Sequence, residues 1–187
     1  MKLDIACGQR LQAEWIGLDI APEENVYVEK GAKYIEHNVL KFPWPIASGS
    51  VDQARCSHFV EHIPHKIEGC EKDGLIAFME EVYRVLKPEG VIVITCPYYL
   101  SQRAHQDPTH CRSITEMTFW YFSSKWMKAM AMSHYGIRTN FEVVQTHMVV
   151  DDDFLMKTNE EKEYARKHIP NAVSDIIVTL VKREEEV

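Results

Sequence analysis

The sequence lacks long apolar runs, paired cysteines and an excess of positive charge. No apolar run among its 187 residues approaches the roughly 20 residues that span a bilayer, and the opening MKLDIACG enters a strand pattern instead of forming a signal peptide. The five cysteines are scattered without a C-x-x-C pair, which favours reduced thiols in the cytoplasm over a disulfide framework. The formal net charge of -7 gives no global attraction to polyanions. We therefore expect a cytoplasmic protein that acts on a small molecule, with no nucleic acid or membrane partner.

Short apolar runs predict buried β-strands at residues 3–7, 15–20, 34–39, 51–59, 91–96, 141–150 and 172–182. Between the fourth and fifth runs, apolar residues recur at three- and four-residue steps from Leu75 to Leu86. This spacing predicts a helix, which Glu89-Gly90 ends after Pro88. A strand, a crossover helix and a second strand form a right-handed βαβ unit, so the pattern predicts an α/β fold with a mostly parallel sheet.

After Tyr98 the sequence becomes polar, and residues 99–114 predict a long functional loop. Thr115 can cap a helical region in which the aromatic-rich run 119–126 and the Met-rich run 127–134 form helices that Gly136 ends. The charged residues 151–171 predict a surface excursion. We expect residues 1–187 to form a single domain, with residues 98–135 on the substrate side.

Several motifs occur in the order found in one enzyme family. The most specific is E-V-Y-R-V-L-K-P-E-G-V-I-V-I-T-C-P at 81–97, accompanied by L-D-I-A-C-G at 3–8, G-L-D-I at 17–20, S-G-S-V-D at 48–52, S-H-F-V-E-H-I at 57–63 and Q-D-P-T-H at 106–110. Over residues 2–123 the chain resembles the class I S-adenosylmethionine-dependent methyltransferases, and among them the small methyltransferase type 11-like subgroup with a shortened first crossover. The resemblance implies a Rossmann-like, doubly wound sheet of seven strands with an antiparallel last strand, and S-adenosyl-L-methionine as the cofactor.

Two positions depart from the family pattern. The usual G-x-G-x-G is A-C-G-Q-R here and keeps only Gly8. The acidic residue expected after the third strand is Asn38, which can still hydrogen-bond an adenine edge or a ribose.

The carboxyl ends of the parallel strands carry the residues that we expect to bind the cofactor, because ligands of doubly wound sheets lie beyond these ends. Gly8 would let the backbone approach the methionine half closely, and Asp19 would accept hydrogen bonds from both ribose hydroxyls. Asp4, a carboxylate inside a buried strand, would orient the turn or the ammonium group. The expected cofactor-binding residues are Asp4, Cys7, Gly8, Asp19, Asn38, Val39, Ser57 and His58.

The first crossover is too short for a helix. Residues 8–15 reach roughly 26 Å when extended, enough to return along a strand of about 17 Å, whereas a helical crossover takes about 10 to 12 residues or more. We therefore expect this helix to be reduced or absent, and one sheet face to lose its cover near Trp15. Trp44, the aromatic run 119–126 or a second subunit in a homodimer would have to cover that face.

Histidines near the strand exits are the catalytic candidates. His58 follows the fourth strand, and His105, Asp107 and His110 lie on the long loop where substrate would enter. A histidine beside a carboxylate is a plausible general base for a hydroxyl nucleophile. The alternative is that Asp107-Pro108-Thr109 forms only a turn.

The segment H-F-V-E-H-I-P-H at 58–65 also raises the question of a metal site, with Cys56 and Cys70 nearby. The spacing matches no closed four-ligand pattern. We therefore expect structural histidines and no bound metal, with His58 or His62 lining the pocket as an intermediate possibility.

Together these features predict methyl transfer from S-adenosylmethionine to an oxygen or nitrogen of a small polar or sugar-like acceptor. Three alternatives stay open: a non-catalytic or cofactor-consuming S-adenosylmethionine-binding protein, a dinucleotide enzyme, and an assembly subunit that uses the uncovered sheet face. The absence of G-x-G-x-x-G after the first apolar run weighs against the dinucleotide enzyme.

Overall fold

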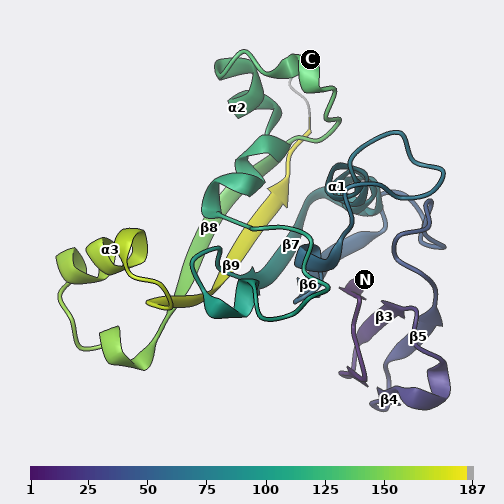
Figure 1. Ribbon diagram of the computed structural model, residues 1–187. Helices are drawn as coiled ribbons and strands as arrows, with labels where there is room; N and C mark the ends of the chain where they lie inside the picture. Colours follow the sequence, from purple (N-terminus) through teal and green to yellow (C-terminus); the bar gives the residue numbers. More distant parts are fainter. Residues whose placement is uncertain (185–187) are drawn as a thin grey trace.

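The structure, a computed structural model, describes residues 1–184 and centres on a seven-stranded sheet of order β5-β3-β1-β6-β7-β9-β8 (Figure 1). Neighbouring strands from β5 to β7 pair in parallel, and β9 is antiparallel to both β7 and β8. This topology confirms the Rossmann-like fold expected from the sequence. The strands are β1 Lys2–Ile5, β3 Trp15–Asp19, β5 Lys33–Glu36, β6 Val51–Ser57, β7 Leu86–Pro97, β8 Phe141–Val150 and β9 Val173–Lys182.

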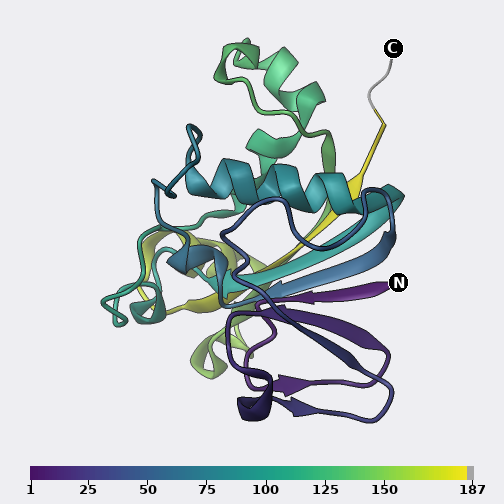
Figure 2. The ribbon, with the colours of Figure 1, turned by 90° about the vertical axis from the view of Figure 1, so that its right-hand side faces the viewer.

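Helix α1, Gly74–Val85, forms the βαβ crossover between β6 and β7 and lies along one face of the sheet (Figure 2). It begins where the Asp73 carboxylate accepts the Leu75 N–H at 2.9 Å, a side-chain N-cap. Its apolar stripe packs into the core with alternate residues of the central strands. The buried members of the stripe include Leu75, Phe78, Met79, Val82 and Val85.

The first crossover contains no helix, as expected. Residues 6–14 form turns around a two-residue strand, β2 Arg10–Leu11, which pairs in parallel with β4 Tyr27–Val28. The second crossover likewise holds only the short 3-10 helix η1 Glu23–Asn25 and β4. A small separate core of Leu11, Val26 and Tyr34 takes the place of the missing helices. Gly17 makes this possible, because a Cβ at that position would lie 2.8 Å from a methyl carbon of Leu11.

The sheet face opposite α1, which we call the open face, stays partly exposed. Strand register aligns Gln53, Val91, Val181 and Glu142 in one row, and all four are half-buried or exposed. The next row aligns Arg55 with Val93, Thr179 and Gln145, again half-buried or exposed. Apolar residues at the centre of an exposed sheet face are unusual for a strand that faces only water.

Trp15, at one side of the open face, is covered from within the chain. The Arg55 guanidinium lies 4.2 Å from the centroid of the Trp15 ring. The Trp15 side chain also packs on the small core of Leu11, Val26 and Tyr34. Trp44 and the 119–126 run do not supply the cover. Trp44 packs edge-on against Phe78 of α1 at 5.7 Å, and Phe119 and Phe122 join the same main core.

Residues 98–135 form less regular helix than expected. The aromatic run begins as a 3-10 helix, η4 Glu116–Phe122, and only α2 Ser124–Ala129 is α-helical. The last piece, η5 Ser133–Tyr135, ends at Gly136 in the left-handed conformation. Bulky aromatic side chains lose rotamer freedom in a helix, which favours this broken path.

The charged excursion after β8 contains η6 Asp152–Phe154 and helix α3 Asn159–His168. Thr158 and Glu161 form a capping box at the start of α3, with each side chain bonded to the other's backbone N–H. Within residues 1–184, no helix is long and apolar enough to cross a membrane.

Candidate cofactor and substrate site

The turn after β1 and the end of β3 are joined by the Asp19 carboxylate. Its Oδ2 accepts the Gly8 N–H at 2.8 Å, and its Oδ1 accepts the Ala21 N–H at 3.0 Å. Gly8 has a φ of +65°, which strains any side chain, and nothing in the protein occupies the space that its Cβ would enter. Each carboxylate oxygen keeps a lone pair that a ligand hydroxyl can use.

Five of the residues expected at the cofactor site line a single cavity of about 850 Å³. The cavity runs from the strand ends onto the open face, where Trp15 and Arg55 also line it. These five residues are Asp4, Cys7, Gly8, Ser57 and His58.

Asp4 lies inside this cavity wall as half of a buried ion pair. Its Oδ2 accepts a hydrogen bond from Arg55 at 2.6 Å, and the Arg55 guanidinium also donates to Gln12 Oε1 at 2.9 Å. Burial raises the pKa of the Asp4 carboxyl, although the arginine acts in the opposite direction. In this structure Asp4 therefore holds Arg55 in place over Trp15.

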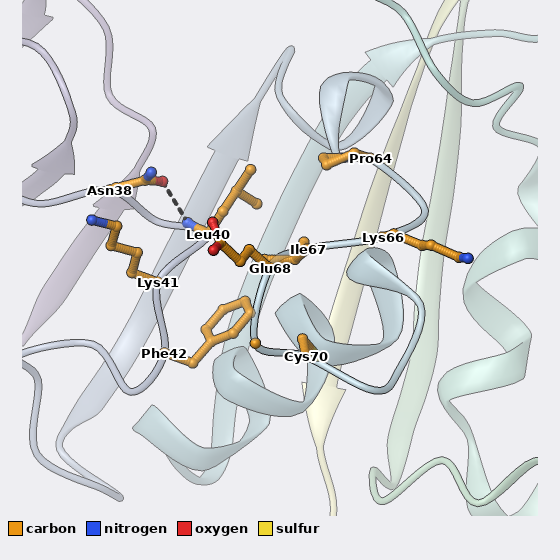
Figure 3. Close-up of a pocket in the computed structure, with 10 residues that line it drawn as sticks. Asn38, Leu40, Lys41, Phe42, Pro64, Lys66, Ile67, Glu68 and Cys70 are labelled. Atoms are coloured by element: carbon orange, nitrogen blue, oxygen red, sulfur yellow. Dashed lines mark hydrogen bonds between the residues drawn. The ribbon is translucent and has the colours of Figure 1, made fainter.

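Asn38 and Val39, like Asp19, are not among the residues that line this cavity. Asn38 lines a separate cavity of about 770 Å³, with Phe42 and Ile67 among its walls (Figure 3). The Asn38 side-chain oxygen accepts the Leu40 N–H at 2.9 Å, the dashed line in Figure 3. Val39 is buried in the core, and its carbonyl accepts the Trp44 indole N–H at 2.9 Å.

His58 occupies the exit of β6 in a strained conformation. Its φ is +52°, a region that non-glycine residues rarely adopt, and its side chain is 40% exposed toward the cavity side. Its Nδ1 lies 3.6 Å from Glu61 Oε1, and this carboxylate raises the pKa of His58. Strain at a strand exit is often retained for function.

The three expected catalytic residues on the 99–114 loop have different surroundings. His105 Nε2 contacts the Tyr99 carbonyl at 2.9 Å, on the backbone of its own loop. Asp107 accepts both the backbone N–H and the hydroxyl of Thr109, which is the turn that the alternative interpretation described. His110 packs edge-on against His62 with ring centroids 4.5 Å apart, so the loop reaches the segment that follows β6.

Glu61 was given no site role from the sequence, and His62 was considered only as an intermediate possibility for lining the pocket, yet these residues and Arg112 join the two segments. The Arg112 guanidinium donates to the carbonyls of Ile63 at 2.7 Å and Pro64 at 3.0 Å. The Cys111 N–H donates to the Glu61 carbonyl at 2.8 Å. Two sequence features could have indicated this contact: the Glu-His pair directly after a strand exit, and D-P-T-H on the loop.

Solved structures with the same fold share this arrangement of strands over nearly the whole chain. A methyltransferase from Archaeoglobus fulgidus, described as S-adenosylmethionine-dependent, has a TM-score of 0.59 at 18% identity, covering 97% of this chain and 85% of its own. A putative methyltransferase from Bacillus halodurans has a TM-score of 0.57 at 16% identity, covering 98% and 92%. A third, a putative methyltransferase in complex with the Haloferax volcanii activator Trm112, has a TM-score of 0.56 at 14% identity, covering 98% and 82%.

The decisive comparison is at the level of sequence families. Residues 3–94, which run from β1 into β7, match a family model described as a methyltransferase domain. The chain is a class I S-adenosylmethionine-dependent methyltransferase. No curated protein matches it in sequence.

The residues of this methyltransferase fit its cofactor. S-adenosylmethionine supplies a sulfonium-bound methyl group that a nucleophile can take directly. The open space over Gly8 admits a ligand close to the backbone, and Asp19 presents a carboxylate already fixed by two backbone N–H groups. Both features lie at the strand ends where cofactors of doubly wound sheets bind.

The chemical state of Cys7 gives a prediction for this methyltransferase. Burial, aided by the Asp4 and Asp19 carboxylates, raises the pKa of Cys7 to about 12. At pH 8 only about one Cys7 thiol in ten thousand is then a reactive thiolate. Iodoacetamide at pH 8 should therefore modify the exposed Cys111 and leave Cys7 unmodified, as read by peptide mass spectrometry. Early labelling of Cys7 would contradict the buried environment described above.

Proposed function

We propose that this methyltransferase transfers a methyl group to an oxygen or nitrogen atom of a small polar, sugar-like acceptor. The observation that carries the proposal is the position of His58. Its half-exposed imidazole lines the same cavity as Gly8 and Cys7, so one group able to take a proton lies beside the expected cofactor site.

The character of the surrounding surface supports a small polar acceptor. The cavity has polar walls, which include the side chains of Arg55, Ser57 and Thr95. The net charge of -7 disfavours a polyanionic substrate. A sugar hydroxyl is matched by imidazole and carboxylate groups, which can accept its proton and its hydrogen bonds.

The protein's part in the reaction is alignment and proton removal. The cofactor, when bound, would supply the sulfonium-bound methyl group, which would pass to the acceptor atom and leave the demethylated cofactor. The walls of the cavity hold the acceptor in line and exclude water. His58 is the group proposed to accept the proton of the acceptor hydroxyl or amine.

The test is a search for acceptors with methyl-labelled S-adenosylmethionine. Purified protein is incubated with metabolite and glycan fractions, and incorporation of label and release of demethylated cofactor are both measured. Incorporation that depends on a small polar fraction supports the proposal. Release without an acceptor would favour the alternative of a cofactor-consuming protein, and binding without release would favour a non-catalytic one.

A second copy of the chain is the partner proposed for the open face. The face has an apolar centre, Val91, Val93 and Val181, with Arg55 on the β6 side and Glu142 on the β8 side. A two-fold axis parallel to the strands, between β7 and β9, would place β6 of one copy against β8 of the other. The apolar centres of the two copies then face each other across an isologous interface.

Replacing Val93 with Asp puts a charge at the centre of this interface and should convert the dimer into a monomer. Sedimentation equilibrium gives the mass of each form, and Leu155→Asp, at an exposed position outside the open face, should stay dimeric. A monomeric unmodified protein would overturn the dimer. The Trm112 complex of one structural neighbour makes a different protein partner the alternative occupant.

Cytoplasmic localisation is supported by the cysteines. All five are free thiols in the structure, as is usual in a reducing compartment. Fractionation of cells that express the protein, followed by immunoblotting, tests this assignment.

A further inference from the structure

The structure places one carboxylate and two imidazoles together, outside the turn around Gly8. One ligand atom from each of Glu61, His62 and His110 lies within 4.8 Å of those of the other two. We propose that these three residues bind a divalent transition-metal ion of the Zn²⁺ type. The proposal differs from the expectation of no metal, which considered only His58, His62 and His65 with the nearby Cys56 and Cys70.

Glu61 is the strongest indication of a missing ligand. The residue is 2% exposed, and both of its carboxylate oxygens are buried without a hydrogen-bond partner. The nearest cationic group, His58 Nδ1, is 3.6 Å away, which is longer than a hydrogen bond. Burying a carboxylate without hydrogen bonds is costly, the contact with His58 reaches only Oε1, and a metal ion on the side of His62 and His110 would reduce that cost.

The hydrogen bonds of the two histidines leave Nε2 of each ring as the possible metal ligand. His110 Nδ1 lies 3.1 Å from the Ala104 carbonyl, which can only accept, so this nitrogen carries the proton. His62 Nδ1 lies 2.9 Å from the Thr109 hydroxyl, and that hydroxyl donates onward to Asp107 at 2.7 Å. The hydroxyl proton is thereby used, so His62 Nδ1 is the donor to Thr109. Nε2 of each ring keeps its lone pair, the arrangement in which a second hydrogen bond fixes a metal-binding imidazole.

The donor set indicates the kind of ion. Two imidazoles and one carboxylate are the protein ligands of an open zinc site, in which a fourth position is left for water or substrate. Bonds of about 2.1 Å require the ligand atoms to move inward by roughly 1 Å from their present separation. His110 lies on a loop, so this movement needs no change in the sheet.

The site lies where it would connect the two parts of the substrate side. Glu61 and His62 belong to the segment after β6, which includes η2 Val60–His62, and His110 belongs to the 99–114 loop. A bound ion would fix this loop next to His58, which is three residues before Glu61. The site does not depend on which acceptor the methyltransferase uses.

The test measures metal binding directly, on untagged protein treated with chelator and returned to metal-free buffer. Titration with Co²⁺ should give the visible absorption of a tetrahedral ion at one equivalent per chain, and Zn²⁺ should displace it. Glu61→Gln and His110→Ala should each weaken Co²⁺ binding by about 100-fold or more. Thr109→Ala, which removes the hydroxyl that joins His62 Nδ1 to Asp107 but no metal ligand, should weaken it by roughly 10-fold or more.

Two control variants separate this site from others. His105→Ala removes a loop histidine outside the cluster, and Cys111→Ser removes the nearest exposed thiol. Both should keep one equivalent of Co²⁺ with unchanged affinity, and circular dichroism confirms that each variant is folded. Equal binding by all variants, loss of binding only in Cys111→Ser, or no binding by the unmodified protein would overturn the proposal.

Discussion

Replacing Asp19 with Ala will lower the affinity for S-adenosylmethionine by about 100-fold or more. The change removes the acceptor of the Gly8 and Ala21 N–H groups, which shapes the turn after β1, together with the acceptor proposed for the ribose hydroxyls. Each hydrogen bond to a charged group contributes about 1.5–3 kcal/mol, so losing two accounts for this magnitude. Isothermal titration calorimetry with the cofactor and with its demethylated product measures the loss.

Asp52→Ala is the matched control for Asp19. Asp52 is also a strand aspartate, but it lies at the opposite end of β6 and pairs with the N-terminus and Lys87 at the exposed surface. Such pairs contribute little, so the control should bind the cofactor as the unmodified protein does. Unchanged affinity in Asp19→Ala would mean that the cofactor binds elsewhere, whereas loss in both variants would indicate a general effect on the fold.

Replacing His58 with Asn will lower kcat by about 100-fold or more while the affinity for S-adenosylmethionine stays within a factor of two. Asparagine is chosen because it tolerates a positive φ better than most residues, so the backbone at +52° is kept while the imidazole is removed. Loss of a general base typically costs 100- to 10,000-fold. The measurement is methyl incorporation into the acceptor fraction that gives the strongest signal, at saturating cofactor.

The control for His58 is His65→Asn. His65 belongs to the same segment but pairs with Asp73 and is 68% exposed, away from the cavity. It should leave both kcat and cofactor affinity unchanged. A normal kcat in His58→Asn would assign the proton to another group, and a weakened cofactor affinity with normal kcat would make His58 a binding residue only.

The positions of Asp19 and Gly8 at neighbouring strand ends could be predicted because their signals are local. Asp19 closes a strand and Gly8 opens a turn, and both roles follow from residue type and position along the chain. The missing first helix followed from the length of residues 8–15 alone. What replaced it, the packing of Leu11 on Gly17, could not be predicted because these residues come from different segments and carry no shared pattern.

The substrate side was less predictable because its contacts also join segments that lie far apart in the chain. His105, Asp107 and His110 looked equivalent in sequence, but only His110 meets His62, because the Arg112 guanidinium bonds the loop to the Ile63 and Pro64 carbonyls. The three histidines at 58–65 suggested a local cluster, whereas the structure separates His65 and adds a histidine from 45 or more residues away. Long-range pairing, not spacing, decides which side chains share a site.

The sequence alone therefore determined the class of fold, the order of its strands along the chain and the placement of Asp19 and Gly8 at neighbouring strand ends, because periodicity and chain length act within each segment. The tertiary structure decided which face of the sheet stays open and which of the histidines meet. Those outcomes depend on contacts between segments far apart in the chain, and such contacts form only when the strands are in register.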